Sequence, residues 1–286
     1  LAWSGEFAGK YLTSAYFVYL ETGDEALKEY VVGFIDRLLA RQDEDGYLGC
    51  YSRETRFTGS LPQTPDKRPW TWDCWAHYHI MYGLLLWNEE TGNERYFEAV
   101  ERMAALLMNT FYNGKKNIVS TGCSEMNLAV YHVFGRLYNR TGKEEYLAFA
   151  RAAEADMGSG ESGGWLEWAA RGGRFCDCRK PRWESLHVVM GFAEMYKGER
   201  KYLAALKATV ESILETDVHN TGGFSTGEQA IGTPYQNGVV ETCCVVAFDA
   251  LVLELYRLTG ELSLVDFLET AHYNAAMGAV SPSGAW

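Results

Sequence analysis

A carboxylate and two thiols occur within four residues, at Glu241, Cys243 and Cys244. Zinc binds oxygen and sulfur donors together, so these side chains are candidate zinc ligands. On a regular helix, at about 100° per residue, Glu241 and Cys243 would point roughly 160° apart, so both can bind one ion only if the helix begins near Cys243. The preceding segment 221–240 is rich in glycine, which predicts a loop followed by such a helix start. The alternative is that the cysteines are small apolar residues buried at a helix start.

A second carboxylate, Glu228, lies thirteen residues before Glu241 in the same glycine-rich segment. Loops on a rigid scaffold often carry catalytic groups, and two carboxylates that converge across a cleft are typical of glycoside hydrolysis. In that reading Glu228 is a candidate catalytic residue. The alternative is an ordinary solvated surface acid.

A short phrase recurs along the chain, in which an acidic residue follows a glycine within two positions. Its glycines are Gly23, Gly92, Gly142, Gly198 and Gly260. Glycine ends a helix in a left-handed cap, and acidic residues suit the positive N-terminus of the next helix. The intervals of 50 to 69 residues each fit two helices and their loops. The repeat therefore predicts a chain of helical hairpins.

The helices on either side of the phrase differ in their apolar pattern. The stretches before it, such as 80–87 and 245–256, are apolar all round, whereas the stretch after the first copy carries one apolar stripe. That stripe comprises Leu27, Tyr30, Val31, Phe34, Ile35, Leu38 and Leu39. An α/α barrel consists of two concentric rings of helices, an inner ring buried on both sides and an outer ring exposed to solvent on one side. The pattern therefore favours an all-α fold, an α/α barrel. A linear solenoid of hairpins is the structural alternative.

The chain has no polar linker long enough to separate two domains, so we predict one domain over residues 1–286. The segments 52–69 and 156–181 are expected to be long loops. Residue 1 is not a methionine and the last residues have turn composition, so we expect a fragment in which the barrel is truncated at both ends.

Charge and hydropathy argue against two classes of partner. The chain has 26 Lys+Arg against 38 Asp+Glu, a net charge of −12, and no long basic block. Nucleic acid and anionic membrane surfaces are therefore excluded as expected partners, and no apolar run is long enough to span a bilayer. The aromatic content of 14% suits a concave site that stacks on sugar rings, although a bulky core also explains it.

The cysteine count bears on the compartment. The chain has seven cysteines, an odd number, and is large enough to fold without stabilising disulfide bonds, so no disulfide framework is expected. Unpaired thiols slightly favour the cytoplasm, while the compartment and the oligomeric state stay unknown.

Several motifs occur in the order found in one enzyme family. They are the run from Gln42 to Gly49, His79 twelve residues before Thr91, Gly227-Glu228, Glu241-Thr242-Cys243, and Glu269 four residues before Tyr273-Asn274. In this order, over nearly the whole chain, the sequence resembles glycoside hydrolase family 127, the β-L-arabinofuranosidases.

The resemblance implies a retaining, zinc-dependent hydrolase with an (α/α)6 barrel followed by β-sandwich domains. It makes Glu241 and Cys243 zinc ligands, Glu228 the general acid/base, and His79 and Glu269 substrate contacts. The family's remaining zinc ligands, one of them the nucleophilic thiolate, form a Cys-Cys pair that would lie beyond residue 286, so the chain alone is expected to be inactive. The expected substrate is a terminal pentofuranose, most plausibly β-L-arabinofuranose, on a plant-derived oligosaccharide or glycoconjugate.

Two other functions fit the same residues. A sugar isomerase or epimerase would use His79, His187 and His219 for proton transfer and would need no cysteine. A noncatalytic sugar-binding barrel would keep the aromatic residues and tolerate the loss of the Glu228 carboxylate. The hydrolase reading requires that Glu228, Glu241 and Cys243 converge in space.

Overall fold

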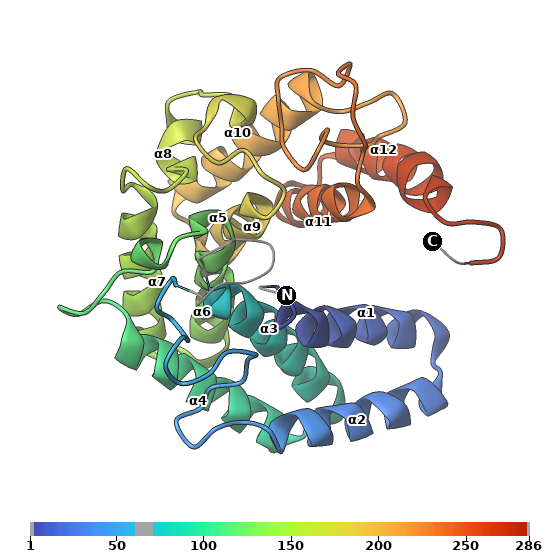
Figure 1. Cartoon of the computed structure of the whole chain (residues 1–286). Helices are drawn as coiled ribbons and strands as arrows, with labels where there is room; N and C mark the ends of the chain where they lie inside the picture. The colour runs from blue at the N-terminus through green and yellow to red at the C-terminus, as the bar shows by residue number, and fades with distance from the viewer. Residues whose placement is uncertain (1–2, 61–70, 285–286) are drawn as a thin grey trace. The chain divides into compact units, whose positions relative to one another are not determined.

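The regular elements of the chain are helices joined by loops (Figure 1). The computed structural model describes residues 3–60 and 71–284. The α-helices are α1 (Glu6–Thr22), α2 (Glu25–Leu39), α3 (Asp73–Thr91), α4 (Glu94–Thr110), α5 (Ser124–Asn127), α6 (Val130–Thr141), α7 (Glu144–Met157), α8 (Trp165–Ala170), α9 (Ser185–Met195), α10 (Arg200–Thr216), α11 (Thr242–Thr259) and α12 (Leu262–Ala271). Across the described residues the β-structure is limited to isolated bridges, which confirms the all-α prediction. Among the same residues, no helix combines the length and the apolar character that crossing a membrane requires.

Four of the five predicted glycine turns end a helix in the left-handed conformation. Their glycines are Gly23, Gly92, Gly142 and Gly260, with φ of 63°, 65°, 69° and 69°. At the first turn the Asp24 carboxylate accepts two backbone N–H groups from the start of α2, which caps that helix. Gly198 differs, because it has φ 91° in a turn after α9 has already ended.

The predicted alternation of buried and half-buried helices is clearest in the α3–α4 hairpin. Side chains of α3 are buried along nearly the whole length from Asp73 to Asn88. α4 buries one face, formed by Tyr96, Ala99, Val100, Met103, Ala104 and Leu107. α1 departs from the pattern: it precedes a glycine turn, yet its Phe17 is 54% exposed.

The chain forms two compact units, Leu1–Ala153 and Glu154–Trp286. The first contains the hairpins α1–α2 and α3–α4, and α1 packs directly on α3. In the second, α9 packs on α10 and α11, and α11 packs on α12. The prediction of a single domain over residues 1–286 stays a prediction.

The predicted loop at 156–181 is partly helical, because α8 and a single 3₁₀ turn at Phe175–Asp177 lie within it. Two tryptophans fix its course: the Trp165 indole N–H donates to the Lys180 carbonyl at 3.1 Å, and that of Trp168 to the Arg174 carbonyl at 2.9 Å. The other predicted loop, 52–69, lies partly outside the described residues.

Candidate active site

The loop 217–241 joins α10 to α11 and carries most of the candidate residues. Asp217, at its start, is 1% exposed, and its Oδ1 accepts the N–H groups of Ile231 at 2.5 Å and Gly232 at 2.9 Å. A buried carboxylate that accepts backbone donors is a strong local anchor. One side chain therefore ties the middle of the loop to the end of α10.

Gly222 lets this loop approach α12 closely, and Gly223 lies tightly against the end of the same loop. A Cβ added to Gly222, which has φ +80°, would lie 2.4 Å from the Cα of Ala271. A Cβ on Gly223 would lie 3.1 Å from Val240. Close packing between the loop and the end of α12 thus requires glycine at position 222, while position 223 has little room beside the residue that precedes Glu241.

Glu241 and Cys243 lie at the start of α11, as the metal hypothesis requires. Glu241 is the N-cap residue, with extended backbone angles φ −86° and ψ 136°, and the helix begins at Thr242. Because the carboxylate precedes the first turn, it can reach the same side as the thiol. Cys243 Sγ donates a hydrogen bond to Glu241 Oε2 at 3.2 Å.

Cys244 belongs to the same cluster. One ligand atom each from Glu241, Cys243 and Cys244 lie within 4.8 Å of one another. Cys243 is exposed, whereas Cys244 is buried. The pKa of the Cys244 thiol is raised well above its ordinary range by its hydrogen bond with Cys243, by burial, and by the charges of Cys243 and Glu241.

The donor set fits zinc. In a tetrahedral site with Zn–S of about 2.3 Å and Zn–O of about 2.0 Å, neighbouring donors are roughly 3.5 Å apart. The 3.2 Å between Cys243 Sγ and Glu241 Oε2 is close to that separation. A zinc ion would also relieve the crowding of three acidic groups, because it binds the deprotonated forms of all of them.

Glu228 is held beside the segment that leads to this cluster. The N–H of Gly227 donates to the carbonyl of Val239 at 3.1 Å, which pairs the two arms of the loop. Glu228 itself has φ +66°, in the left-handed region that non-glycine residues rarely adopt. Strained backbone of this kind is concentrated at functional sites.

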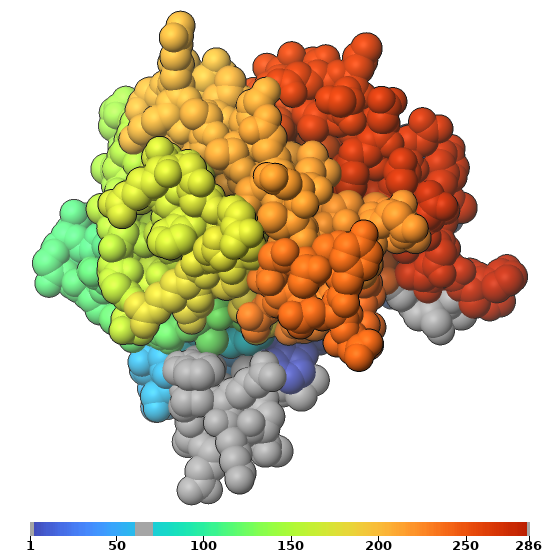
Figure 2. Space-filling model, turned by 90° about the horizontal axis from the view of Figure 1, so that it is seen from above, coloured from blue at the N-terminus to red at the C-terminus, as the bar shows by residue number. Residues whose placement is uncertain are grey.

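A second segment, 181–185, which precedes α9, pairs with this loop through backbone hydrogen bonds. The N–H of Trp183 donates to the Glu228 carbonyl at 3.3 Å, that of Ala230 to the Pro181 carbonyl at 2.8 Å, and Arg182 forms an antiparallel bridge with Gln229. In Figure 2 the yellow surface that precedes α9 borders the orange surface of the loop.

The side chains at this border form an ion-pair cluster. Arg182 Nη2 contacts Glu228 Oε2 at 2.8 Å. The same guanidinium binds Glu184 through two bonds of 3.0 Å and 2.9 Å. Burial raises the pKa of the Glu184 carboxyl, and its pairing with Arg182 opposes that rise.

The two predicted substrate contacts, His79 and Glu269, belong to different units of the chain. His79 lies on α3 in the unit Leu1–Ala153; it is 7% exposed and its ring meets that of Trp75 edge-on at 4.3 Å. Glu269 is exposed on α12, shortly before a π-helical turn at His272–Ala276 that includes the Tyr-Asn motif. Within the described residues its carboxylate makes no hydrogen bond or ion pair with Glu228, Glu241 or Cys243. The assignment of His79 and Glu269 to substrate stays a prediction.

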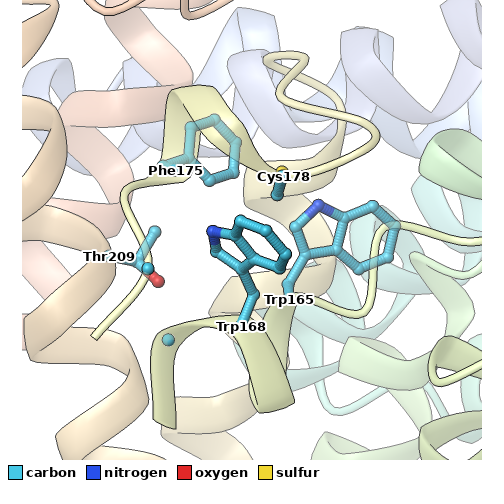
Figure 3. Close-up of a pocket in the computed structure, with 7 residues that line it drawn as sticks. Trp165, Trp168, Phe175, Cys178 and Thr209 are labelled. Carbon is cyan, nitrogen blue, oxygen red and sulfur yellow. The ribbon is translucent and has the colours of Figure 1, made fainter. Parts of the chain in front are cut away.

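The unit Glu154–Trp286 contains an aromatic pocket. It is lined by Trp165, Trp168, Ala169, Gly173, Phe175, Cys178 and Thr209 (Figure 3). The indole N–H groups of Trp165 and Trp168 both donate to backbone carbonyls of the segment 156–181, and Trp165 is 2% exposed. Trp165 therefore packs in the core and is not placed to stack on a sugar.

Sequence reasoning singled out Glu228, Glu241 and Cys243 but not Arg182, which contacts Glu228, nor Glu184, which contacts Arg182. Neither residue belongs to a motif, and both lie more than forty residues before Glu228. The charged run around Arg182 was the one available signal, and it resembles any solvated surface segment.

The loop 217–241 thus carries Glu228 and leads directly into the cluster of Glu241, Cys243 and Cys244 at the start of α11. The sequence profile of the beta-L-arabinofuranosidase GH127 catalytic domain matches residues 1–285. The chain therefore belongs to glycoside hydrolase family 127, as the motifs predict.

Solved structures of similar fold agree. A GH127 beta-L-arabinofuranosidase from Geobacillus stearothermophilus T6 has a TM-score of 0.75 and 18% identity, covering 99% of this chain and 48% of that one. A second GH127 beta-arabinofuranosidase has a TM-score of 0.68 and 19% identity over 97% of this chain and 45% of that one. A family 105 glycoside hydrolase from C. acetobutylicum has a TM-score of 0.64 and 13% identity over 99% and 80%.

These likenesses confirm the α/α-barrel fold class. The chain spans about half the length of the GH127 structures that it matches. No curated protein sequence matches it.

Proposed function

We propose that this chain provides the acid/base and part of the metal site of a retaining glycoside hydrolase that removes a terminal β-L-arabinofuranose from plant-derived oligosaccharides or glycoconjugates. The observation that carries the proposal is the cluster of Glu241, Cys243 and Cys244 within 4.8 Å, at the end of the loop that holds Glu228. Family membership supports the same reaction class.

Glu228 has the role of general acid and base. In the first step its protonated carboxyl gives a proton to the departing glycosidic oxygen as the bond to the anomeric carbon breaks and a thiolate forms a bond to that carbon. In the second step the carboxylate takes a proton from water, whose oxygen displaces the sulfur and regenerates the acid. Each turnover therefore returns Glu228 to its starting state.

Glu241 and Cys243 would hold a zinc ion, and Cys244 is the third donor within reach. When bound, zinc supplies a positive charge that keeps cysteine thiols deprotonated near neutral pH. The hydrogen bond from Cys243 to Glu241 orients both side chains toward one point before any ion binds. His79 and Glu269 are proposed to contact the sugar.

Hydrolysis by a Glu228→Gln variant tests this proposal. The chain, together with any sequence that follows residue 286 in its gene, is assayed on an aryl and on an alkyl β-L-arabinofuranoside. Because general acid catalysis contributes about 10²–10⁴ in rate, the variant should lose about that factor in kcat/KM, which reports the first step, on the alkyl substrate and less on the aryl one, whose leaving group needs less protonation.

A matched control is Glu161→Gln, which removes an exposed glutamate that is ion-paired with Arg179 at 3.5 Å. It should leave turnover unchanged. Equal turnover of the wild-type protein and the Glu228→Gln variant on both substrates would exclude the acid/base assignment.

A further inference from the structure

Arg182 joins two carboxylates that lie at different depths. It holds Glu228 through one contact of 2.8 Å and Glu184 through a two-bond pair of 3.0 Å and 2.9 Å. The side chain of Glu184 is 4% exposed, that of Arg182 23% and that of Glu228 40%. A guanidinium with two donors on one carboxylate is fixed in its plane, so the donor that it aims at Glu228 is fixed as well.

The backbone holds the two segments together without this side chain. Trp183 N–H donates to the Glu228 carbonyl and Ala230 N–H to the Pro181 carbonyl. The backbone hydrogen bonds alone hold segment 181–183 against the loop, and the Arg182 side chain additionally fixes the position of the Glu228 carboxylate. Its loss should leave the loop in place.

The charges of the cluster are suited to a carboxylate that must gain and lose a proton. With both carboxylates ionised, one positive and two negative charges give a net charge of −1, and protonation of Glu228 makes the cluster neutral. An arginine without Glu184 would hold Glu228 in the ionised form, because an opposite charge within about 4–6 Å favours ionisation. A general acid needs the protonated form at the start of each cycle.

The other titratable groups on the elements around Glu228 are few. They are His187 on the first turns of α9 and, in the loop itself, Asp217, His219, Tyr235 and Glu241. Asp217 is committed to the loop backbone. Arg182 contacts the Glu228 carboxylate directly, and Glu184 is linked to it through Arg182.

We propose that Arg182 is a positioning residue that orients the Glu228 carboxylate, and that Glu184 balances the Arg182 charge so that Glu228 can still be protonated. The inference rests on the proposed function, because it gives Glu228 the acid/base role. It assigns two residues to the site that no sequence motif includes.

The test is the titration of Glu228 in the 286-residue chain, measured by ¹³C NMR with glutamate labelled at the carboxyl carbon and assigned with Glu228→Gln. Arg182→Gln removes the cation and leaves two carboxylates facing each other, so the Glu228 midpoint should rise by about one pH unit. Glu184→Gln leaves the cation unbalanced, so the midpoint should fall by about one pH unit. The double variant should lie between the two.

Arg179→Gln and Glu161→Gln are matched controls, because they break an exposed pair of the same residue types. Neither should move the midpoint of Glu228. Circular dichroism and thermal unfolding of each variant show whether it folds. A cluster that only clamps the loop would give folded variants whose Glu228 midpoint does not move, or moves in the same direction for both, and either result overturns the inference.

The two proposals fail separately. If Glu228→Gln abolishes turnover but the Arg182 and Glu184 variants show no opposite shifts, the acid/base role stands and the positioning role is wrong. If the shifts occur but Glu228→Gln keeps full turnover, the cluster controls a carboxylate that does not serve the reaction, and the inferred positioning role in catalysis falls with the proposed function.

Discussion

Glu241 and Cys243 are two residues apart, yet they contact each other because the backbone changes from extended to helical between them. Sequence reasoning could state this condition in advance, since an unbroken helix would separate the two side chains. It could not decide whether Cys244 joins them, because that depends on how far the first turn of α11 rotates its side chain toward the cluster.

Removal of the Cys243 thiol should weaken zinc binding. Loss of a residue that merely supports a ligand costs about 10–100-fold in affinity, so loss of a ligand in Cys243→Ser should cost at least about tenfold. The measurement is competition with a chromophoric zinc chelator at pH 7.5. Cys50→Ser, at another exposed free cysteine, is the control and should bind as the wild type does. Equal affinity of the Cys243→Ser variant would remove this thiol from the metal site.

Asp249, in the middle of α11, should make the free energy of unfolding depend on pH. Burial raises the pKa of its carboxyl to about 7. The folded state therefore binds the proton more tightly than the unfolded state, whose pKa is near 3.9, and the free energy of unfolding should fall as pH rises from about 4 to about 7. Asp249→Asn should remove this loss.

Urea unfolding at pH 5 and pH 8 measures the effect. At pH 8 the Asp249→Asn variant should be more stable than the wild type by about 1–2 kcal/mol, after allowance for solvent screening of a partly exposed carboxylate. The difference should shrink at pH 5. Asp266→Asn on α12, at an exposed position, is the control with no expected gain. A stabilisation that is the same at both pH values would show that Asp249 is not the titrating group.

At the scale of elements, helices and their ends follow from the sequence better than the loops do. The helix predicted after Gly23 occurs as Glu25–Leu39, and its cap is the acidic residue that the repeated phrase supplies. The apolar stripe was less reliable for individual residues: Val31 and Ile35 are fully buried, but Tyr30 is 60% exposed. Local chemistry sets where a helix begins and ends, while burial depends on what packs against it.

The loop 217–241 shows the limit of local reasoning. Its glycine content predicts an irregular segment, but its course depends on Asp217, on close packing with α12, and on pairing with residues 181–183. These contacts join positions that are distant in the sequence, and no periodic pattern encodes them.

Asp217→Ala should loosen this loop, because it leaves two partly buried backbone donors without their acceptor. The expected cost is about 2–4 kcal/mol, from about 1–3 kcal/mol for each unsatisfied group with partial rescue by water. Hydrogen exchange at the Ile231 and Gly232 amides should accelerate, whereas Asp217→Asn, which keeps one acceptor oxygen, should show a smaller change. Unchanged exchange in the alanine variant would mean that the loop is held by other contacts.

At the scale of the whole molecule, the acidic composition argues against nucleic acid and anionic membrane surfaces as partners, and this stays a prediction. A net charge of −12 without basic blocks fits a protein whose ligand is neutral, such as a sugar. The all-α barrel class was predictable because the repeated phrase and the apolar patterns agree on helical hairpins. The division into two compact units was not, because no linker marks the boundary within α7.

The stereochemistry of the first product tests the central claim, that the chain is part of a retaining hydrolase acting on β-L-arabinofuranosides. The protein, with any sequence that follows residue 286 in its gene, is incubated with an aryl β-L-arabinofuranoside and methanol, and the methyl glycoside, which cannot mutarotate, is followed by ¹H NMR. Two displacements at the anomeric carbon predict methyl β-L-arabinofuranoside as the initial product. The α-anomer as the initial product, or no release of the aryl group at all, would contradict the account.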